Sequence, residues 1–359
     1  MSNFKDNAQN QVLFIRHHAF GDVLLTTPFF KMLYKQNPAI RIDLYSKWGE
    51  VYSPSAGFGK WISMDRIPIA NVLKNDYSNI YWFNYEFDRS LHILDGYAFS
   101  TGLSLKDKTL SWTVLPDELT RAKILLKDVK RPLVGFLPVC GNIIKNLSSE
   151  KMQQIIDAVR KRLGMTVAVF ADRPLKVCGC LNFSNRFASI RDLAAVISLC
   201  DVWLTIDTGP FHLAQALGVP TVGLFGCTFP ELLATHPSQL QAVYVKSLPC
   251  LGCYHRVPRG NKTAPLCAQG DHACMRMLSE SDVVQAIVQS LEHREDVSLK
   301  HRIEMYEAYR SSYLAQSNKE KHDVITMYQK DIHRCNLEIN LIRRMCISIK
   351  EYITLLSTA

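Results

Sequence analysis

Short apolar runs alternate with longer segments of helical periodicity along most of this chain, and this alternation restricts the fold more than any other feature. The run Gln11–Arg16 is typical of a buried strand, and Gly21-Asp22 opens an apolar segment of helical period over Val23–Lys35. The strand pattern returns at Arg41–Tyr45. A strand, a helix and a strand in this order require a parallel sheet with a right-handed crossover. We therefore predict that the chain begins with a βαβ unit.

The same alternation starts again after Arg131-Pro132. The elements predicted for this second half are a strand at Leu133–Leu137, a helix at Ser148–Leu163, a strand at Thr166–Phe170, a helix at Ile190–Ser198, a strand at Val202–Ile206, a helix at Pro210–Leu217 and a strand at Thr221–Phe225. Two such halves predict an α/β fold of two doubly wound, Rossmann-like domains that face each other across a cleft. In the first half we also expect strands at Ile80–Phe83 and Leu110–Val114, with the rest of Trp48–Gly102 irregular.

These patterns divide the chain into three parts. We expect one Rossmann-like domain over residues 1–125 and another over residues 126–295, with the boundary inside Leu115–Lys130. From Ser279 the pattern turns helical, and Glu280–Glu292 reads as one amphipathic helix. Residues 296–359 are predicted to form a helical extension, which would pack on the first domain or pair with another chain.

The composition is that of a globular protein, because 47% of the 359 residues are hydrophobic and 21% are charged. The longest apolar runs, such as Val219–Phe225, fall far short of the ~20 residues that span a bilayer. Met1–Asn10 has no apolar core, so we expect no secretory signal and a cytoplasmic location. The net charge of +9 suits phosphorylated substrates or peripheral contact with an anionic membrane surface. No block of Lys and Arg accompanies it, so no nucleic-acid partner is expected.

The segment Asp207–Leu213 (DTGPFHL) carries the strongest functional signal, because it follows a predicted buried strand. Pro210 suits the first turn of a helix, and a helix N-terminus at the carboxyl edge of a sheet is an anion-binding site. The backbone N–H groups expected to be free there are those of Thr208, Gly209 and Phe211. An ordinary turn capped by Asp207 or Thr208 explains the same residues.

A second glycine turn, His17–Val23 (HHAFGDV), follows the first predicted strand. Gly21 permits close approach of backbone or substrate. Asp22 is either an N-cap or a cleft carboxylate that takes the proton from an attacking hydroxyl, which is the task of the single base in an inverting glycosyl transfer. His212 likewise is either a buried structural histidine or part of the phosphate site.

The two motifs together, RHHAFGDVLLTTP and DTGPFHLAQALGVPTVGLFGCTFP, resemble glycosyltransferase family 9. That family contains the ADP-heptose:lipopolysaccharide heptosyltransferases and the autotransporter heptosyltransferases. The resemblance extends over Val12–Ile287 in order and spacing. It implies a GT-B fold with an acceptor domain first and a nucleotide-sugar domain second, and catalysis without a cofactor.

The resemblance also assigns residues. The catalytic aspartate of the family falls on Asp22, and its diphosphate-binding residues fall on Asp207, Thr208, Gly209 and His212. Pro210 is also expected to contact substrate. Lys145, in the loop Pro138–Asn146, would be the cation that meets the β-phosphate, although a solvated loop lysine would look the same. Arg16 and His18 would flank the acceptor side and orient substrate, although a charge at a strand end is commonly a surface residue. Gly21 is also expected to contact substrate.

Four of the 11 cysteines gather in the loop 250–274, namely Cys250, Cys253, Cys267 and Cys274. The spacing of the first pair suits a tetrahedral metal, whereas six residues separate the second pair, unlike a usual zinc ribbon. His255 and His272 are candidate replacements for one ligand. Four thiolates suit Zn or Fe alike, and free or partly oxidised thiols are the alternative. Similar loops hold iron in autotransporter heptosyltransferases, so the resemblance implies a structural metal. The cysteines expected to be isolated hydrophobes are Cys140, Cys200, Cys227, Cys335 and Cys346.

The sequence thus predicts an inverting glycosyltransferase that moves a heptose or related sugar from ADP-heptose to an acceptor hydroxyl. The acceptor would be a lipopolysaccharide core sugar, a lipid-linked glycan or a protein, and the helical extension would support a homo-oligomer. Two other functions stay open, because fold and anion site do not fix the reaction: a GT-B epimerase and a non-catalytic sugar-nucleotide-binding protein.

Overall fold

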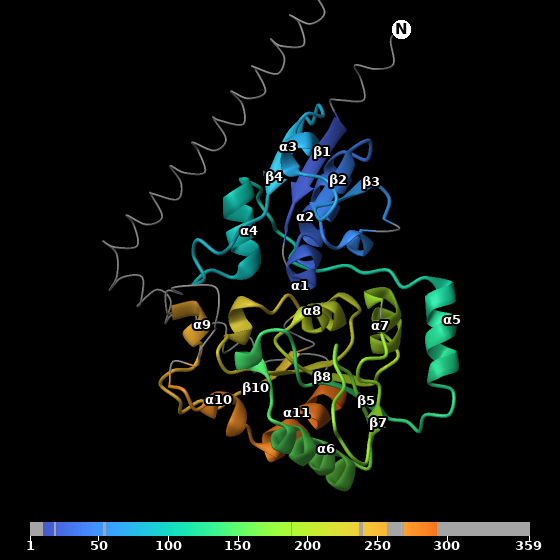
Figure 1. The fold of residues 1–359 in the computed structure, drawn as a ribbon, viewed down its shortest axis with the longest axis vertical. Helices are drawn as coiled ribbons and strands as arrows, with labels where there is room; N and C mark the ends of the chain where they lie inside the picture. The colour runs from blue at the N-terminus through green and yellow to red at the C-terminus, as the bar shows by residue number, and fades with distance from the viewer. Residues whose placement is uncertain are drawn as a thin grey trace, which may run out of the picture.

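The computed structural model describes residues 10–17, 19–52, 55–187, 189–236, 240–256, 267 and 269–292. Within these residues the chain forms two parallel sheets with helices packed on them, and Figure 1 shows one domain above the other. The predicted α/β class, with two parallel sheets and helices packed on them, is confirmed. The predicted helical extension at 296–359 lies outside the described residues.

The first sheet has the strand order β3-β2-β1-β4, and every pair of neighbouring strands is parallel. Its strands are β1 (Gln11–Ile15), β2 (Arg41–Ser46), β3 (Phe58–Ser63) and β4 (Asn79–Trp82). The helices of this domain are α1 (Phe20–Leu24), α2 (Thr27–Gln36), α3 (Ile69–Val72) and α4 (Ile93–Thr101), with a 3-10 turn, η2, at Gly49–Val51. The apolar run of β1 is buried because it is a central strand covered on both faces.

The single helix predicted over Val23–Lys35 is wrong, because the structure divides it into α1 and α2. Pro28 has no N–H and its ring would meet the carbonyl one turn earlier, so an unbroken helix cannot pass through it. The hydroxyl groups of Thr26 and Thr27 instead donate to the carbonyls of Val23 and Leu24, at 2.6 and 2.8 Å. The break leaves α1 as a separate short helix that faces the second domain (Figure 1).

The second sheet has the order β10-β9-β8-β5-β6-β7 and is also parallel throughout. Its strands are β5 (Leu133–Leu137), β6 (Thr166–Val169), β7 (Leu181–Asn182), β8 (Val202–Ile206), β9 (Thr221–Leu224) and β10 (Leu240–Val243). The helices that accompany it are α6 (Ser149–Leu163), α7 (Ile190–Ile197), α8 (Gly209–Ala216), α9 (Cys253–Arg256), α10 (Ala273–Arg276) and α11 (Glu280–Glu292), with 3-10 turns η3 (Ile143–Lys145) and η4 (Pro230–Leu232). Helices α6 and α11 pack on one face of the sheet, and α7 and α8 lie on the other (Figure 1).

Helix α6 shows why the predicted elements of this half form. The hydroxyl group of Ser148 accepts a hydrogen bond from the N–H of Lys151 and so caps the first turn. Gly164 ends the helix in the left-handed conformation that glycine adopts without strain. Between these caps, the buried side chains recur at helical spacing and face the sheet: Met152, Ile155, Ile156 and Val159.

The segment between the two sheets differs from its prediction. Leu110–Val114 forms no strand, because the N–H of Ser111 donates to the hydroxyl group of Thr27 (3.2 Å) and not to a neighbouring strand. Helix α5 (Pro116–Leu125) then lies inside the predicted boundary region. Although α5 falls in the expected first domain, it packs on α7 of the second, where Arg191 pairs with Glu118.

Candidate active site

A cleft of about 270 Å³ lies between the two domains, where α1 and α8 meet. Its walls contain most of the residues that the two motifs and the family resemblance predicted, namely Gly21, Asp22, Lys145, Asp207, Thr208, Gly209 and His212. Arg16 and Pro210 are not among the lining residues. The predicted substrate residue His18 lies outside the described residues. The tertiary structure therefore brings together two turns that are far apart in the sequence.

Asp22 occupies the first turn of α1 and is not its N-cap, which is Ala19. Its carboxylate accepts a hydrogen bond from Arg16 (2.7 Å, Oδ2 to Nη2), and its carbonyl accepts one from the hydroxyl group of Tyr97 at 3.0 Å. Burial raises the pKa of Asp22 above its usual value, although the neighbouring Arg16 opposes that rise. The result is an oriented carboxylate at the cleft wall with a strengthened affinity for a proton.

Arg16 has a different place from the one predicted, since its side chain is only 4% exposed and lies behind Asp22. The guanidinium group of Arg16 donates to Asp22 through Nη2. It also donates to the Glu86 carboxylate, through Nη2 at 2.6 Å and through Nη1 at 3.0 Å. The rings of Tyr85 and Tyr97 flank it at 5.1 and 5.4 Å. These contacts make Arg16 a positioning residue for Asp22, which the sequence alone did not indicate.

Lys145 and Asp207 form an ion pair at the opposite wall, with 2.5 Å between Nζ and Oδ2. The loop before η3 is closed by Asn146, whose side chain accepts from the N–H of Cys140 and donates to its carbonyl. Burial alone would lower the pKa of Lys145, but the Asp207 carboxylate outweighs it and raises the pKa. Lys145 is therefore a buried cation held at the cleft and not a solvated loop residue.

The start of α8 completes this wall. Thr208 is its N-cap, but no side-chain hydrogen bond caps the helix. Of the three N–H groups expected to be free, that of Phe211 donates to the carbonyl of Thr208 at 3.0 Å, so this part of the prediction is wrong. His212 is buried, which lowers its pKa to about 4, and its Nδ1 has no hydrogen-bond partner among the described residues. A neutral imidazole with an unused nitrogen thus faces the cleft.

Three further residues of the cleft were missed by the sequence reasoning: Arg89, Tyr254 and His255. Arg89 lies in the loop before α4, and the other two lie on α9. Nδ1 of His255 is 2.9 Å from the carbonyl oxygen of Arg89, which joins the two domains. His255 was one of two candidate replacements for a metal ligand, but it lines the cleft and not the cysteine cavity. No sequence motif marks these positions, because they meet only through the tertiary fold.

The four cysteines of the loop 250–274 gather around one small cavity, together with Cys227 and His272. The expectation that Cys227 is isolated is therefore wrong. Burial, and then the neighbouring thiols, raise the pKa of Cys274 to about 11. Thiolates are the ligands that a thiophilic cation prefers, and a bound cation would lower the pKa of Cys274. No set of three His, Cys, Asp or Glu side chains in the described part of the chain has the arrangement of metal ligands.

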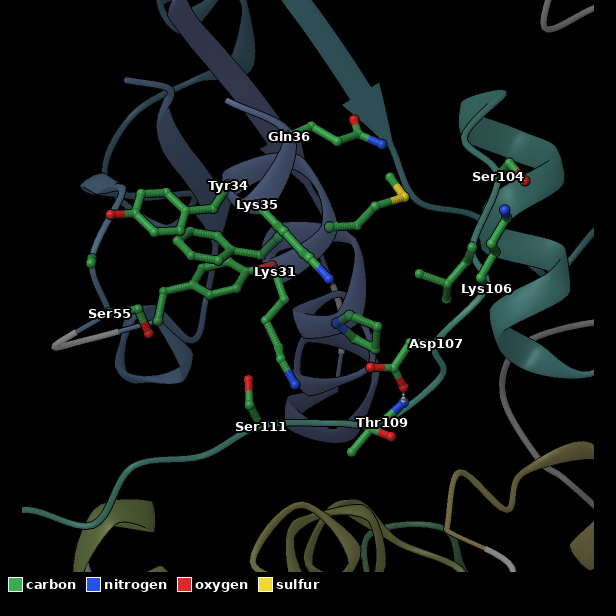
Figure 2. Close-up of a pocket in the computed structure, with 16 residues that line it drawn as sticks. Lys31, Tyr34, Lys35, Gln36, Ser55, Ser104, Lys106, Asp107, Thr109 and Ser111 are labelled. Atoms are coloured by element: carbon green, nitrogen blue, oxygen red, sulfur yellow. Dashed lines mark hydrogen bonds between the residues drawn. The ribbon is translucent and has the colours of Figure 1, made fainter. Parts of the chain in front are cut away.

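A larger cavity of about 900 Å³ lies in the first domain, on the outer side of α2. Figure 2 shows Lys31 and Lys35 extending into it, close to the segment that carries Asp107 and Thr109. It contains none of the residues predicted for a site. The smaller interdomain cleft, where both motifs and several buried ionisable groups meet, is the better candidate for chemistry.

In the described residues, no helix is both long and apolar enough to cross a membrane.

Comparison with known proteins finds similarity to one family over part of the chain. Residues 97–263 match the sequence model of glycosyltransferase family 9 (heptosyltransferase). The matched segment contains Lys145 and Asp207–His212, but it does not reach Asp22. Two curated relatives from Campylobacter jejuni, both called lipooligosaccharide heptosyltransferase 2, are 33% and 31% identical over 106 and 105 residues. These alignments span 30% of the length of each relative.

Solved structures share the fold across most of the described chain. A glycosyltransferase family 9 protein from Veillonella parvula has a TM-score of 0.59 at 18% identity, covering 79% of this chain and 97% of that one. ADP-heptose lipopolysaccharide heptosyltransferase II of E. coli has a TM-score of 0.60 at 15% identity, with 78% and 98% covered. The iron-containing dodecameric glycosyltransferase TibC of enterotoxigenic E. coli has a TM-score of 0.58 at 14% identity, with 79% and 76% covered. The chain is thus similar to glycosyltransferase family 9 (heptosyltransferase) over residues 97–263, and its α/β fold is similar to the folds of these solved structures.

Proposed function

We propose that the chain is an inverting glycosyltransferase that moves a heptose or a related sugar from ADP-heptose to an acceptor hydroxyl. The observation that carries the proposal is the cleft between the domains, where Asp22 lies on one wall and Lys145 with the start of α8 on the other. A base and a leaving-group site on opposite sides of one cleft suit a single displacement at the anomeric carbon.

Asp22 acts as the general base. The acceptor hydroxyl gives its proton to the Asp22 carboxylate as its oxygen forms a bond to the anomeric carbon. Burial raises the pKa of this carboxyl group, and a base with a raised pKa accepts a proton more readily. Arg16 holds the carboxylate in place and opposes the rise in the pKa of Asp22 that burial causes. One base is sufficient for an inverting transfer.

Lys145 and the start of α8 receive the leaving group. The bond between the anomeric carbon and the diphosphate oxygen breaks, and the electron pair leaves with the diphosphate. Lys145 is charged and buried, so its interaction with the departing diphosphate is weakly screened. Asp207 orients Lys145 through their ion pair, and neutral His212 offers a ring nitrogen to the same site.

The donor is proposed from the relatives. A TibC structure contains ADP-D-β-D-heptose and has a TM-score of 0.61 to this chain. The acceptor, in this proposal, is a lipopolysaccharide core sugar, a lipid-linked glycan or a protein hydroxyl group. We further propose a cytoplasmic enzyme that contacts the inner membrane peripherally and forms a homo-oligomer. The net charge of +9 supports the membrane contact, and the dodecameric assembly of TibC supports the oligomer.

The cysteine cavity is proposed to hold a structural Zn or Fe ion with no role in the chemical step. The proposed ligands are Cys250, Cys253, Cys267 and Cys274. The support is that all four line one cavity large enough for about one ion, and that TibC is iron-containing. A bound metal would fix the loop that places α9 against the cleft.

The substitution Asp22→Asn tests the catalytic proposal, because it keeps the shape of the side chain and removes the base. We expect the rate of ADP release from ADP-heptose in the presence of a heptose-free core acceptor to fall about 10²- to 10⁴-fold. Binding of ADP, measured by calorimetry, should stay close to that of the unchanged chain. The exposed Asp76→Asn is the matched control. Transfer at the unchanged rate by D22N would disprove the assigned role.

A further inference from the structure

Arg89 differs from the other cations of the cleft. It comes from the loop between β4 and α4 and lines the cleft on the side of the first domain. Its Nε is buried and has no hydrogen-bond partner in the described part of the chain. Arg89 therefore lines the cleft with a buried N–H donor that has no partner among the described residues.

The neighbouring cations are already paired. Lys145 is bound to Asp207, and Arg16 is bound to both Asp22 and Glu86. Across the residues that the structure describes, Arg89 has no carboxylate within ion-pair distance. An anion that enters the cleft can thus bind Arg89 without breaking an existing ion pair, whereas at Lys145 it must share the cation with Asp207.

Tyr254 links the two cations that border the cleft. The centroid of its ring lies 4.9 Å from the guanidinium carbon of Arg89 and 5.4 Å from Nζ of Lys145. Both distances are within the range of cation–π attraction. The next residue, His255, is bound to the carbonyl of Arg89 and stacks on Phe229 at 5.9 Å. One short helix therefore sets the place of a cation from each domain.

We propose that Arg89 and Lys145 together hold the diphosphate of the donor, with Tyr254 fixing the position of both cations. This inference rests on the proposed function and names a second diphosphate-binding residue for it. A diphosphate carries more than one negative charge, and two cations from opposite walls match it better than one. The planar guanidinium also binds phosphate oxygens in a forked geometry that lysine cannot offer. Because Arg89 and Lys145 belong to different domains, the diphosphate ties the two walls of the cleft together.

The cysteine cavity is connected to the donor site through α9. Cys253 lines the cavity, and Tyr254 directly follows it on α9. The N–H of Tyr254 donates to the carbonyl of Cys227 at 2.8 Å, and the N–H of Gly252 donates to that of Gly226 at 2.9 Å. Residues on both sides of Cys253 are thus tied to the loop after β9. A shift of the cysteines moves the ring that positions Arg89 and Lys145.

Calorimetry with the full chain tests the inference, using ADP, inorganic pyrophosphate and adenosine as the three ligands. We expect Arg89→Gln to weaken binding of ADP and pyrophosphate about tenfold or more, because it removes a charge-assisted hydrogen bond. Binding of adenosine should not change. Arg89→Lys keeps the charge and should weaken binding of ADP and pyrophosphate less than R89Q does. It also provides the test if R89Q does not fold. The exposed Arg66→Gln is the matched control.

Tyr254 is tested by two substitutions. Tyr254→Phe keeps the aromatic face and should bind pyrophosphate nearly as well as the unchanged chain. Tyr254→Leu removes the face and should weaken pyrophosphate binding severalfold, with no change for adenosine.

The outcomes separate this inference from the proposed function. If the unchanged chain binds ADP and R89Q binds it equally well, the inference is wrong and the proposed function stands. A rise confined to the KM of the acceptor in R89Q also overturns it, and would assign Arg89 to the acceptor. If the unchanged chain binds neither ADP nor pyrophosphate, the proposed function fails and the inference fails with it.

Discussion

Gly21 packs with its backbone against Gly209: a Cβ atom at Gly21 would lie 3.0 Å from the Cα of Gly209 and 3.1 Å from the ring of His212. A Cβ atom at Gly209 would lie 2.8 Å from the ring of Phe20 and 3.2 Å from the N of Gly21. The two glycine turns of the sequence therefore touch each other. Their lack of side chains serves the contact between the domains, and this contact sets the width of the cleft.

Adding one methyl group at either turn should widen that contact. We expect Gly21→Ala and Gly209→Ala to lower the free energy of unfolding by about 1–3 kcal/mol, because backbone atoms cannot yield as a flexible side chain can. The KM for the donor should also rise, since the two walls move apart. Chemical denaturation and steady-state kinetics measure the two effects. Gly141→Ala is the control for stability, because a Cβ atom there meets nothing within 4 Å. Wild-type stability and KM in both variants would contradict the account.

Arg16→Gln should change the pH dependence of transfer. Burial raises the pKa of Asp22 and Arg16 lowers it, so loss of the guanidinium raises that pKa further. A base must be unprotonated, and the activity is therefore lost as the pH falls through the pKa of Asp22. The acidic limb of kcat/KM should move to higher pH in R16Q, and much less in Arg16→Lys. An unmoved limb would show that Arg16 does not act through Asp22.

The pair of Lys145 and Asp207 should behave as a buried ion pair. Removing one partner leaves the other charge buried, so Lys145→Met and Asp207→Asn should each cost about 3–5 kcal/mol of unfolding free energy. The double variant should lose clearly less than the sum of the two. Denaturant unfolding of all four proteins measures this coupling. The more exposed pair of Lys108 and Asp95 serves as the control, and its cycle should give about 0–1 kcal/mol. Additive losses at Lys145 and Asp207 would argue against the pairing.

Three histidines at the domain contact predict a loss of stability in acid: His212 is buried, and His92 and His255 are half-buried. Burial lowers the pKa of His92, His212 and His255 to about 4, whereas an unfolded histidine has a pKa of about 6.5. Between these values the unfolded chain binds more protons than the folded one. The stability is therefore full above pH ~6.5 and falls as the pH drops toward 4. Unfolding free energies measured across this range should decline, and the non-titrating His255→Asn should reduce the slope. A flat profile would be inconsistent with neutral histidines at the domain contact.

The cysteine cavity predicts a metal-dependent stability. Elemental analysis of the purified full chain should find close to one Zn or Fe per molecule, and Cys274→Ser should lower both that content and the Tm. Cys178→Ser is the matched control, because Cys178 is exposed and lies outside the cavity. Only trace metal in the unchanged chain would remove the proposed site.

Most of the second domain could be predicted from the sequence. Its parallel strands are buried on both faces and read as short apolar runs, and caps such as Ser148 and Gly164 mark the helix ends. The helices and strands of the first domain were harder to predict. Strand β3 carries exposed residues, so its composition did not indicate a strand. The helix predicted from Val23 is broken before Pro28, so its apolar periodicity did not indicate two helices.

The sequence by itself determined the two turns, because Gly21-Asp22 and Asp207–His212 each follow a buried strand and must lie at the carboxyl edge of a sheet. Lys145 was assigned through the resemblance to glycosyltransferase family 9. Only the tertiary structure decided that Arg16 supports Asp22, that Cys227 joins the cysteine cavity, and that Arg89 meets Tyr254. These contacts join positions far apart along the chain, and no local periodicity or spacing encodes them. The packing of one domain on the other turned two local turns into one cleft.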